Sequence, residues 1–238
     1  MNVAYWDDLA DQWDDKVFSA RRYDRHRVVP QTLQRIARRR RGQVVADFGC
    51  GPGDFIPLLS RTFERVVAYD QSPKCVELAA RRSRRLRNVE VVRPPSTLDD
   101  WHDQCDVVLC VNVVIHPRRQ NRMQTLERAL DLLRPGGRLV LVVPSIESEC
   151  LLAEATRTAA RNTVRMPRGK RSVNIGVLSV VGVPTKHFAA AELRALAAGL
   201  GLREVEVSRV EYSWSSYGLR PIRPAGLRPW DWMVEARC

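Results

Sequence analysis

Val44–Gly53 reads VVADFGCGPG, and this stretch decides the fold. Three apolar residues end a buried strand, an aspartate follows, and glycines then stand at alternate positions. Glycine adopts positive φ readily and lets the backbone approach a ligand closely. Residues 55–63 (FIPLLSRTF) follow with apolar side chains at helical spacing. The stretch therefore predicts a strand, a tight turn and a helix whose first N–H groups point at a bound molecule.

A second strand is predicted over Arg65–Asp70 (RVVAYD), and it ends in an acid. Asp70 lies 17 residues beyond Gly53. A carboxylate at this place can accept hydrogen bonds from both hydroxyls of an adenosine ribose. The simpler interpretation is an aspartate in an ordinary turn. It accounts for Asp70 alone, but not for its combination with the glycine-rich turn.

At these residues the chain resembles the class I S-adenosylmethionine-dependent methyltransferases. Asp47–Gly53 (DFGCGPG) looks like the first motif of that family, and Asp70 matches its ribose-binding acid. The resemblance implies an α/β, Rossmann-like fold. Its sheet is seven-stranded and mostly parallel, with one antiparallel strand and helices on both faces. The resemblance also implies S-adenosyl-L-methionine as the cofactor.

Three later segments extend the resemblance. Cys105–Asn112 (CDVVLCVN) resembles the fourth motif, whose end contacts the methionine part of the cofactor. Leu133–Gly137 (LRPGG) leads into a strand over residues 138–143 and has a structural role, since its glycine pair supplies a positive-φ turn. Trp230–Arg237 resembles the final strand of the family, which pairs antiparallel between the fifth and the sixth.

Two site positions leave alternatives open. His116 stands where many relatives carry a histidine near the transferred methyl group, and histidine has a suitable pKa for a general base. Because Pro117 follows, His116 is equally explained as a cap of the next helix. At the adenine the family usually has an acid, whereas this chain has Pro94-Pro95-Ser96-Thr97, so the Ser96 hydroxyl or a backbone carbonyl would serve there.

The residues expected to contact the cofactor come from the N-terminal segment and from the loops that follow the first four strands. No metal site is expected, because the four histidines have no ligand spacing. The predicted cofactor-binding residues are Trp13, Asp47, Gly49, Cys50, Gly51, Asp70, Gln71, Ser96, Cys110, Val111 and Asn112, and the catalytic candidate is His116.

A single domain over residues 1–238 is expected. Residues 1–41 form an N-terminal helical cap, 42–143 the cofactor-binding core, 144–183 a lid or substrate wall, and 184–238 the C-terminal part of the sheet. The cap contains two helices, over residues 3–20 and 27–41, and the first has an aromatic stripe that folds over the cofactor or packs on the core. The aromatic side chains of Tyr212, Trp214 and Tyr217 either face the substrate pocket or pack its rim.

The net charge of +12 comes from 39 lysines and arginines against 27 acids. Such a balance raises the prior for a nucleic-acid partner. However, the arginine runs end two helices, over residues 27–41 and 73–87, and each of these leads into a strand. Both runs therefore lie at the amino edge of the sheet, whereas ligands of such sheets bind beyond the carboxyl edge. Basic residues of the lid either attract an anionic acceptor or form a solvated face.

The function expected from the sequence is methyl transfer to a small-molecule acceptor, at oxygen, nitrogen or carbon. The alternatives are an RNA methyltransferase, supported only by charge, and a non-catalytic cofactor-binding protein of the same fold. No apolar run has the length of a membrane span. Six cysteines without paired spacing favour a reducing cytoplasm. The sequence predicts no particular oligomeric state.

Overall fold

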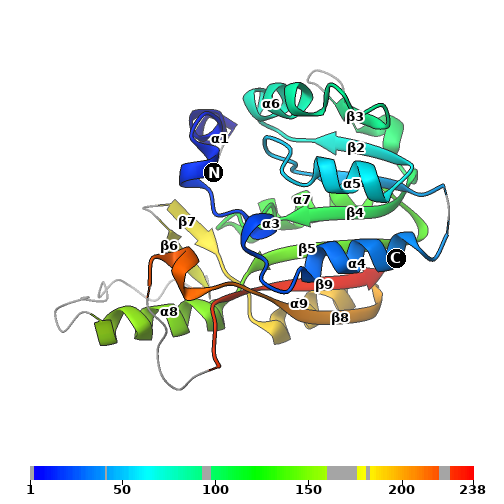
Figure 1. Ribbon diagram of the computed structural model, residues 1–238. Helices are drawn as coiled ribbons and strands as arrows, with labels where there is room; N and C mark the ends of the chain where they lie inside the picture. The colour runs from blue at the N-terminus through cyan, green and yellow to red at the C-terminus, as the bar shows by residue number, and fades with distance from the viewer. Residues whose placement is uncertain (1–2, 41, 93–97, 160–175, 181–182, 220–225) are drawn as a thin grey trace.

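We describe the protein from a computed structural model, which covers residues 3–40, 42–92, 98–159, 176–180, 183–219 and 226–238. A seven-stranded sheet runs through it, and Figure 1 shows helices in front of this sheet and behind it. The strands, in spatial order, are β3 (Val89–Val92), β2 (Arg65–Tyr69), β1 (Val44–Phe48), β4 (Cys105–Val111), β5 (Leu133–Pro144), β9 (Trp230–Arg237) and β8 (Arg203–Glu211).

The sheet has one antiparallel strand, β9. The pairs of β1 with β2 and β4, of β2 with β3 and of β4 with β5 are parallel. Strand β9 runs against both β5 and β8. The predicted α/β, Rossmann-like sheet with a reversed strand between the fifth and the sixth is therefore confirmed. Because β9 runs antiparallel, it begins at the carboxyl edge of the parallel strands. There Asp231 lies opposite Pro144, the last residue of β5, in the strand register.

Alternate residues of the central strands fill two cores. In β4, Val107 and Leu109 pack against α4 (Val28–Ala37) and α5 (Ile56–Thr62). Their neighbours Val108 and Cys110 face the core beneath α7 (Arg119–Leu130) and α9 (Ala190–Gly199). Because side chains alternate across a strand, a run that is apolar throughout predicts burial on both faces. Helix α6 (Pro73–Ser83) covers β2 and β3 on the α4 face.

The two arginine-rich helices are shorter than the sequence predicts. Helix α4 ends at Ala37 and α6 at Ser83, whereas helical patterns were expected to extend to 41 and 87. Consecutive arginines place like charges three and four residues apart, which disfavours further helix. In α6 the Ser83 hydroxyl donates to the Ala79 carbonyl at 2.7 Å, a local bond that often accompanies a helix end.

The N-terminal segment forms three short helices and not the single one expected. They are α1 (Val3–Ala10), α2 (Trp13–Lys16) and α3 (Ala20–Tyr23). The chain becomes extended at Val17, and Ser19 caps α3 by accepting a hydrogen bond from the Arg22 N–H at 3.2 Å. Figure 1 shows α1 beside α6 and α3 near the front of the sheet. The segment thus bends around the carboxyl edge.

Helix α8 (Ile146–Ala159) and the two-stranded sheet of β6 (Val177–Val180) and β7 (Val183–Lys186) follow β5. They belong to the segment predicted as a lid. Most of its basic residues lie outside the described ranges, so a lid function stays a prediction. Within the described ranges, none of the helices combines the length and apolarity that a bilayer crossing requires.

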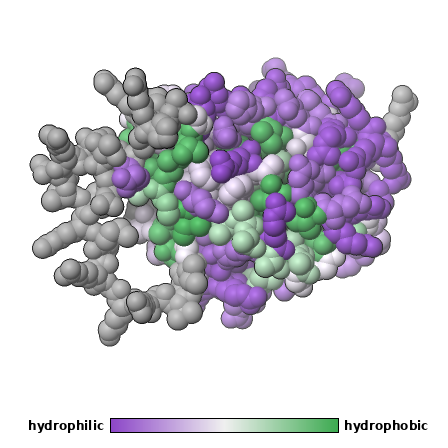
Figure 2. All heavy atoms as spheres, turned by 90° about the horizontal axis from the view of Figure 1, so that it is seen from below, coloured by the Kyte–Doolittle hydropathy of each residue, from purple (hydrophilic) through white to green (hydrophobic). Residues whose placement is uncertain are grey.

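The two ends of the strands differ in polarity. Figure 2 shows the molecule from below, with hydrophilic side chains over most of its right-hand part and hydrophobic ones gathered toward the left and the centre. The right-hand end is the amino edge of the parallel strands in Figure 1. The arginines that follow α4 and α6 are exposed there, as the connectivity predicts.

Candidate functional site

The loops after β1 and β2 are neighbours at the carboxyl edge. The Gly51 N–H donates to Asp70 Oδ2 at 2.8 Å. The N–H groups of Gly49 and Cys50 donate to the Tyr69 carbonyl at 2.7 and 2.9 Å. The glycine-rich turn and the acid after the second strand therefore lie side by side, which is the geometry expected from the sequence.

Asp70 is buried and has backbone donors on both oxygens. Its Oδ1 accepts from the Ser72 N–H at 2.9 Å, in addition to the Gly51 bond on Oδ2. Burial raises the pKa of Asp70, and the two N–H bonds oppose this shift. Each carboxylate oxygen can accept a second hydrogen bond. Asp70 is therefore oriented by the backbone and retains acceptor capacity.

Two further acceptors at this edge lack a partner among the described residues. They are Oδ2 of Asp47, in β1, and Oδ1 of Asn112, directly after β4, and both atoms are buried. Buried polar atoms are nearly always hydrogen-bonded, so two unpaired acceptors in one loop cluster indicate a missing donor. Burial raises the pKa of Asp47 to about 8, and the nearby charges of Asp70 and Asp54 add to the shift. A cationic donor would reverse it.

Glycine is required at two positions of the turn. Gly49 has a φ of +76° and Gly51 a φ of +53°. A Cβ on Gly49 would lie 2.3 Å from a methyl group of Val113, and one on Gly51 would lie 2.7 Å from the Trp13 ring. The turn thus fits under Trp13 only without side chains at these positions.

The N-terminal cap is fastened over this turn. Asp7 of α1 accepts hydrogen bonds from the Ser72 hydroxyl and from the Lys74 N–H, the latter at 3.2 Å. The ring of Trp13 lies 6.0 Å from that of Trp6. Trp13, which the sequence predicts to contact the cofactor, therefore covers Gly51.

The other predicted contacts differ in exposure. Cys50 and Cys110 are buried, and burial raises the pKa of both thiols, so they act as small apolar groups. Val111 is half-buried and Gln71 is exposed. Ser96 lies outside the described residues. Cofactor contacts through these side chains stay predictions.

His116 lies at the start of α7. Its Nδ1 accepts from the Arg118 N–H at 3.0 Å, and its carbonyl accepts from Arg122 Nη1 at 2.7 Å. Partial burial lowers the pKa of His116, and the charges of Arg118 and Arg122 act in the same direction. Arg118 is the N-cap residue of α7, and among the described residues no side-chain hydrogen bond caps this helix, so the capping interpretation of His116 is wrong. A role as catalytic base stays a prediction.

A second polar cluster at the same edge was missed by the sequence analysis. The Tyr212 hydroxyl donates to Asp231 Oδ2 at 2.8 Å. His187 Nε2 lies 3.7 Å from Glu149 Oε1. Burial raises the pKa of Asp231 to about 6, although the bond from Tyr212 lowers it. The available signal was a charge inside an apolar strand, Trp230-Asp231-Trp232.

The predicted aromatic residues of the C-terminal part meet the cap. Phe18 stacks on Tyr217 with ring centroids 4.9 Å apart and contacts the edge of Tyr212 at 4.7 Å. Tyr212 is fully buried, and the buried Trp214 donates its ring N–H to the Leu227 carbonyl at 3.0 Å. Tyr212 and Tyr217 therefore join the polar cluster of Asp231 to the N-terminal cap.

Comparison with known proteins agrees with this geometry. Residues 45–137 match the family described as a methyltransferase domain. The predicted resemblance to the class I methyltransferases, whose cofactor is S-adenosyl-L-methionine, is confirmed over these residues. Its sulfonium and ammonium charges fit a site with the unpaired acceptors of Asp47 and Asn112 and the carboxylate of Asp70.

Individual relatives cover part of this chain or share its fold. An uncharacterised 37.1 kDa protein of transposon TN4556 from Streptomyces fradiae is 35% identical over 46% of this chain and 32% of its own length. The tRNA (carboxymethyluridine(34)-5-O)-methyltransferase ALKBH8 of Mus musculus is 25% identical over 52% of this chain and 18% of its own. This chain thus spans a third or less of these two curated relatives.

A solved structure matches over nearly the whole chain. It is the Burkholderia thailandensis 1,6-didemethyltoxoflavin-N1-methyltransferase, with bound 1,6-didemethyltoxoflavin and S-adenosylhomocysteine. The TM-score is 0.57 at 21% identity, and the match covers 99% of this chain and 84% of that one. At this identity the likeness supports the fold, including the parts outside residues 45–137.

Proposed function

We propose that this protein transfers the methyl group of S-adenosylmethionine to a small-molecule acceptor. The observation that carries the proposal is the pair of buried acceptors without a donor, Asp47 Oδ2 and Asn112 Oδ1, beside Asp70 in a methyltransferase domain. The cofactor supplies an activated methyl group on a positively charged sulfur.

The chain binds and orients the donor. Asp47 and Asn112 accept hydrogen bonds from the ammonium of the methionine part, and Asp70 accepts from the ribose hydroxyls. Trp13 and the cap shield the turn from water. The buried carboxylates favour a cationic ligand. Positioning of donor and acceptor can contribute roughly 7–11 kcal/mol to such a reaction.

The acceptor lies, in this proposal, against the cluster of Asp231, Glu149, His187 and Tyr217. These groups are hydrogen-bond acceptors or can become so, which suits an acceptor that carries hydroxyl or amine protons. With a pKa of about 6, Asp231 is ionised at neutral pH and can take such a proton. His116 is the other candidate for that role.

An RNA substrate is the second candidate. Curated relatives named as tRNA methyltransferases match about half of this chain, and the net charge is +12. Against it, the arginines that follow α4 and α6 lie at the edge of the sheet opposite the site. For the location we propose the cytoplasm, because all six cysteines are free thiols.

The test is methyl incorporation from labelled S-adenosylmethionine into fractions of a cell extract. Label in a low-molecular-weight fraction that survives ribonuclease supports the proposal. Label that ribonuclease removes supports the RNA candidate. S-adenosylhomocysteine binding by calorimetry without any incorporation indicates a non-catalytic binding protein. The Asp70→Asn variant serves as the control for labelling that does not depend on the site.

A further inference from the structure

A second pocket lies outside the site described above, between the cap and the outer helices. It is a hollow of about 600 Å³. Four arginines line it, Arg21 and Arg22 of α3, Arg27 before α4 and Arg61 of α5, together with the apolar side chains of Val17 and Leu58. We propose that this pocket binds a ligand bearing a phosphate group.

The carboxylates of the pocket are already engaged. Asp24 is buried and accepts from the N–H groups of Val28 and Val29 at 3.0 and 2.9 Å. Asp54 accepts from the Ser19 hydroxyl at 3.0 Å and lies 3.3 Å from Arg82. Asp14 lies 3.6 Å from Arg82 as well, and Arg82 is outside the pocket lining. The three aspartates therefore bond to other groups and not to the four arginines.

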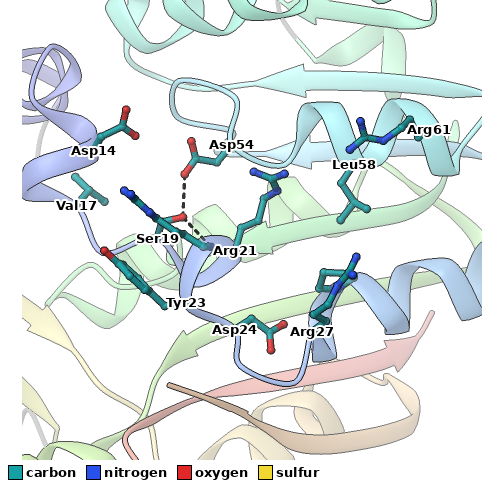
Figure 3. Close-up of a pocket in the computed structure, with 12 residues that line it drawn as sticks. Asp14, Val17, Ser19, Arg21, Tyr23, Asp24, Arg27, Asp54, Leu58 and Arg61 are labelled. Atoms are coloured by element: carbon teal, nitrogen blue, oxygen red, sulfur yellow. Dashed lines mark hydrogen bonds between the residues drawn. The ribbon is translucent and has the colours of Figure 1, made fainter. Parts of the chain in front are cut away.

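Throughout the part of the chain that the structure describes, the guanidinium groups of these four arginines form no ion pair. Arg22 only faces the Tyr23 ring, at 5.8 Å. Figure 3 shows the side chains of Arg27 and Arg61 on either side of Leu58, with their guanidinium groups toward the space over it. The four arginines thus surround an apolar floor without ion-pair partners among the described residues, and an anion would supply such a partner.

The backbone at Arg27 supports a built site. Arg27 adopts left-handed geometry, with φ 53° and ψ 38°, which is uncommon for a residue other than glycine. Both oxygens of Asp24 hold the turn that follows it, through Val28 and Val29. Such outliers persist where the surroundings enforce them, and they concentrate at ligand sites. Here the turn directs the Arg27 side chain into the pocket.

Phosphate is the anion that fits this set. The planar guanidinium fork matches phosphate oxygens with two parallel hydrogen bonds, and Arg is preferred over Lys where such recognition matters. The apolar side chains of Val17, Pro30 and Leu58 can contact an organic part of the same ligand. The volume is within the range of small-molecule sites. A phosphate ester of a metabolite and a phosphodiester of RNA share this chemistry.

The test uses inorganic pyrophosphate as the probe, with calorimetry on the full chain. The variant is Arg27→Asn with Arg61→Ala, because asparagine tolerates left-handed geometry and alanine suits the exposed face of α5. The matched control is Arg84→Ala with Arg85→Ala, which removes the same charge at the exposed end of α6 on the amino edge.

We expect one pyrophosphate per chain, and binding weakened about tenfold or more in the pocket variant but little changed in the control. Equal weakening in both variants, or no binding to the wild type, would overturn the inference. A second arm adds a short single-stranded RNA. Competition between RNA and pyrophosphate, lost in the pocket variant, assigns the site to a nucleic-acid backbone, and its absence assigns it to a small phosphate ester. S-adenosylhomocysteine binding, measured in parallel, reports separately on the proposed methyltransferase site.

Discussion

Buried carboxylates at the two edges of the sheet differ in their hydrogen-bond and ion-pair partners. Toward the amino edge, Asp106 accepts from the Val44 N–H at 2.8 Å and from Arg134 at 2.7 Å. Glu235 lies 3.0 Å from Arg138 and is bonded by Arg35 as well. Buried acids there have cationic partners. They join strands and helices, and their role is structural.

At the carboxyl edge, Asp47, Asp70 and Asp231 form no ion pair with a lysine or an arginine among the described residues. Burial raises the pKa of each. Asp70 accepts from backbone N–H groups and Asp231 from the Tyr212 hydroxyl, whereas Oδ2 of Asp47 has no partner among the described residues. Such groups cost stability and are retained where function requires them. The contrast therefore locates the chemistry at the edge where the polar groups are least satisfied.

The largest expected effect comes from a substitution that disrupts the ion pairs at the amino edge. Among the described residues, Glu235→Gln leaves Arg35 without a carboxylate partner and leaves Arg138, which is 11% exposed, with only the half-exposed Glu204 as one. Removal of one member of a buried ion pair typically costs about 3–5 kcal/mol, so the free energy of unfolding in urea should fall by that order. Affinity for S-adenosylhomocysteine should not change. A loss below about 1 kcal/mol would contradict the structural role of this edge.

The next prediction concerns a substitution at the carboxyl edge that keeps the shape of the Asp70 side chain. Asp70→Asn retains one acceptor for a backbone N–H but removes the charge that the ribose hydroxyls would meet. Hydrogen bonds to charged groups contribute about 1.5–3 kcal/mol each, so affinity for S-adenosylhomocysteine should fall about a hundredfold.

Asp106→Asn is the matched control, since it makes the same substitution at the other edge. It should lower the free energy of unfolding and leave the affinity intact. If calorimetry gave Asp70→Asn the same affinity as the wild type, the ribose would not bind at this position.

A third prediction uses the pKa of Asp47, which is about 8 against 3.8 for the free side chain. In the folded protein without ligand, Asp47 stays protonated at neutral pH, whereas in the unfolded chain it ionises above about pH 4. The free energy of unfolding therefore falls as the pH rises from about 4 to 8. A ligand ammonium favours the carboxylate. Binding of S-adenosylhomocysteine should then release up to one proton below pH 8 and strengthen as the pH rises toward 8, by at most about tenfold per pH unit.

Calorimetry in two buffers with different ionisation enthalpies measures this proton release. Asp47→Asn should abolish it, and the variant should also be more stable than the wild type at pH 8. Proton release that persists in the variant would assign the linkage to another group.

Local patterns made much of the fold and the cofactor loop predictable. The turn at Gly49 and Gly51 requires positive φ, and apolar runs buried on two faces identify central strands, so residues 44–70 were placed from sequence. Helix ends were less predictable. The pattern predicts helix through the arginine runs after α4 and α6, whereas like charges disfavour further helix there and both helices end earlier.

The polar cluster could not be predicted because its members are far apart in sequence. Asp231, His187 and Glu149 come from β9, from the residue after β7 and from α8, and only the reversed strand brings Asp231 to the carboxyl edge. His116 illustrates the other limit. A histidine before a proline suits both a base and a helix cap, and the sequence contains nothing that separates the two.

The smallest expected effect concerns the hydrogen bond between Tyr212 and Asp231 at the carboxyl edge. Tyr212→Phe removes the hydroxyl that donates to Asp231 at 2.8 Å, in a fully buried position. The free energy of unfolding should fall by about 1–3 kcal/mol at neutral pH, because an ionised acid loses a buried donor.

Since that bond lowers the pKa of Asp231, its loss raises the pKa above about 6. Well below pH 6 the carboxyl is protonated in both folded proteins, so the penalty should shrink there. Urea unfolding at pH 7.5 and at about pH 4 measures the difference. A penalty independent of pH would mean that Tyr212 acts through packing alone, and that Asp231 is not the group by which this edge responds to protons.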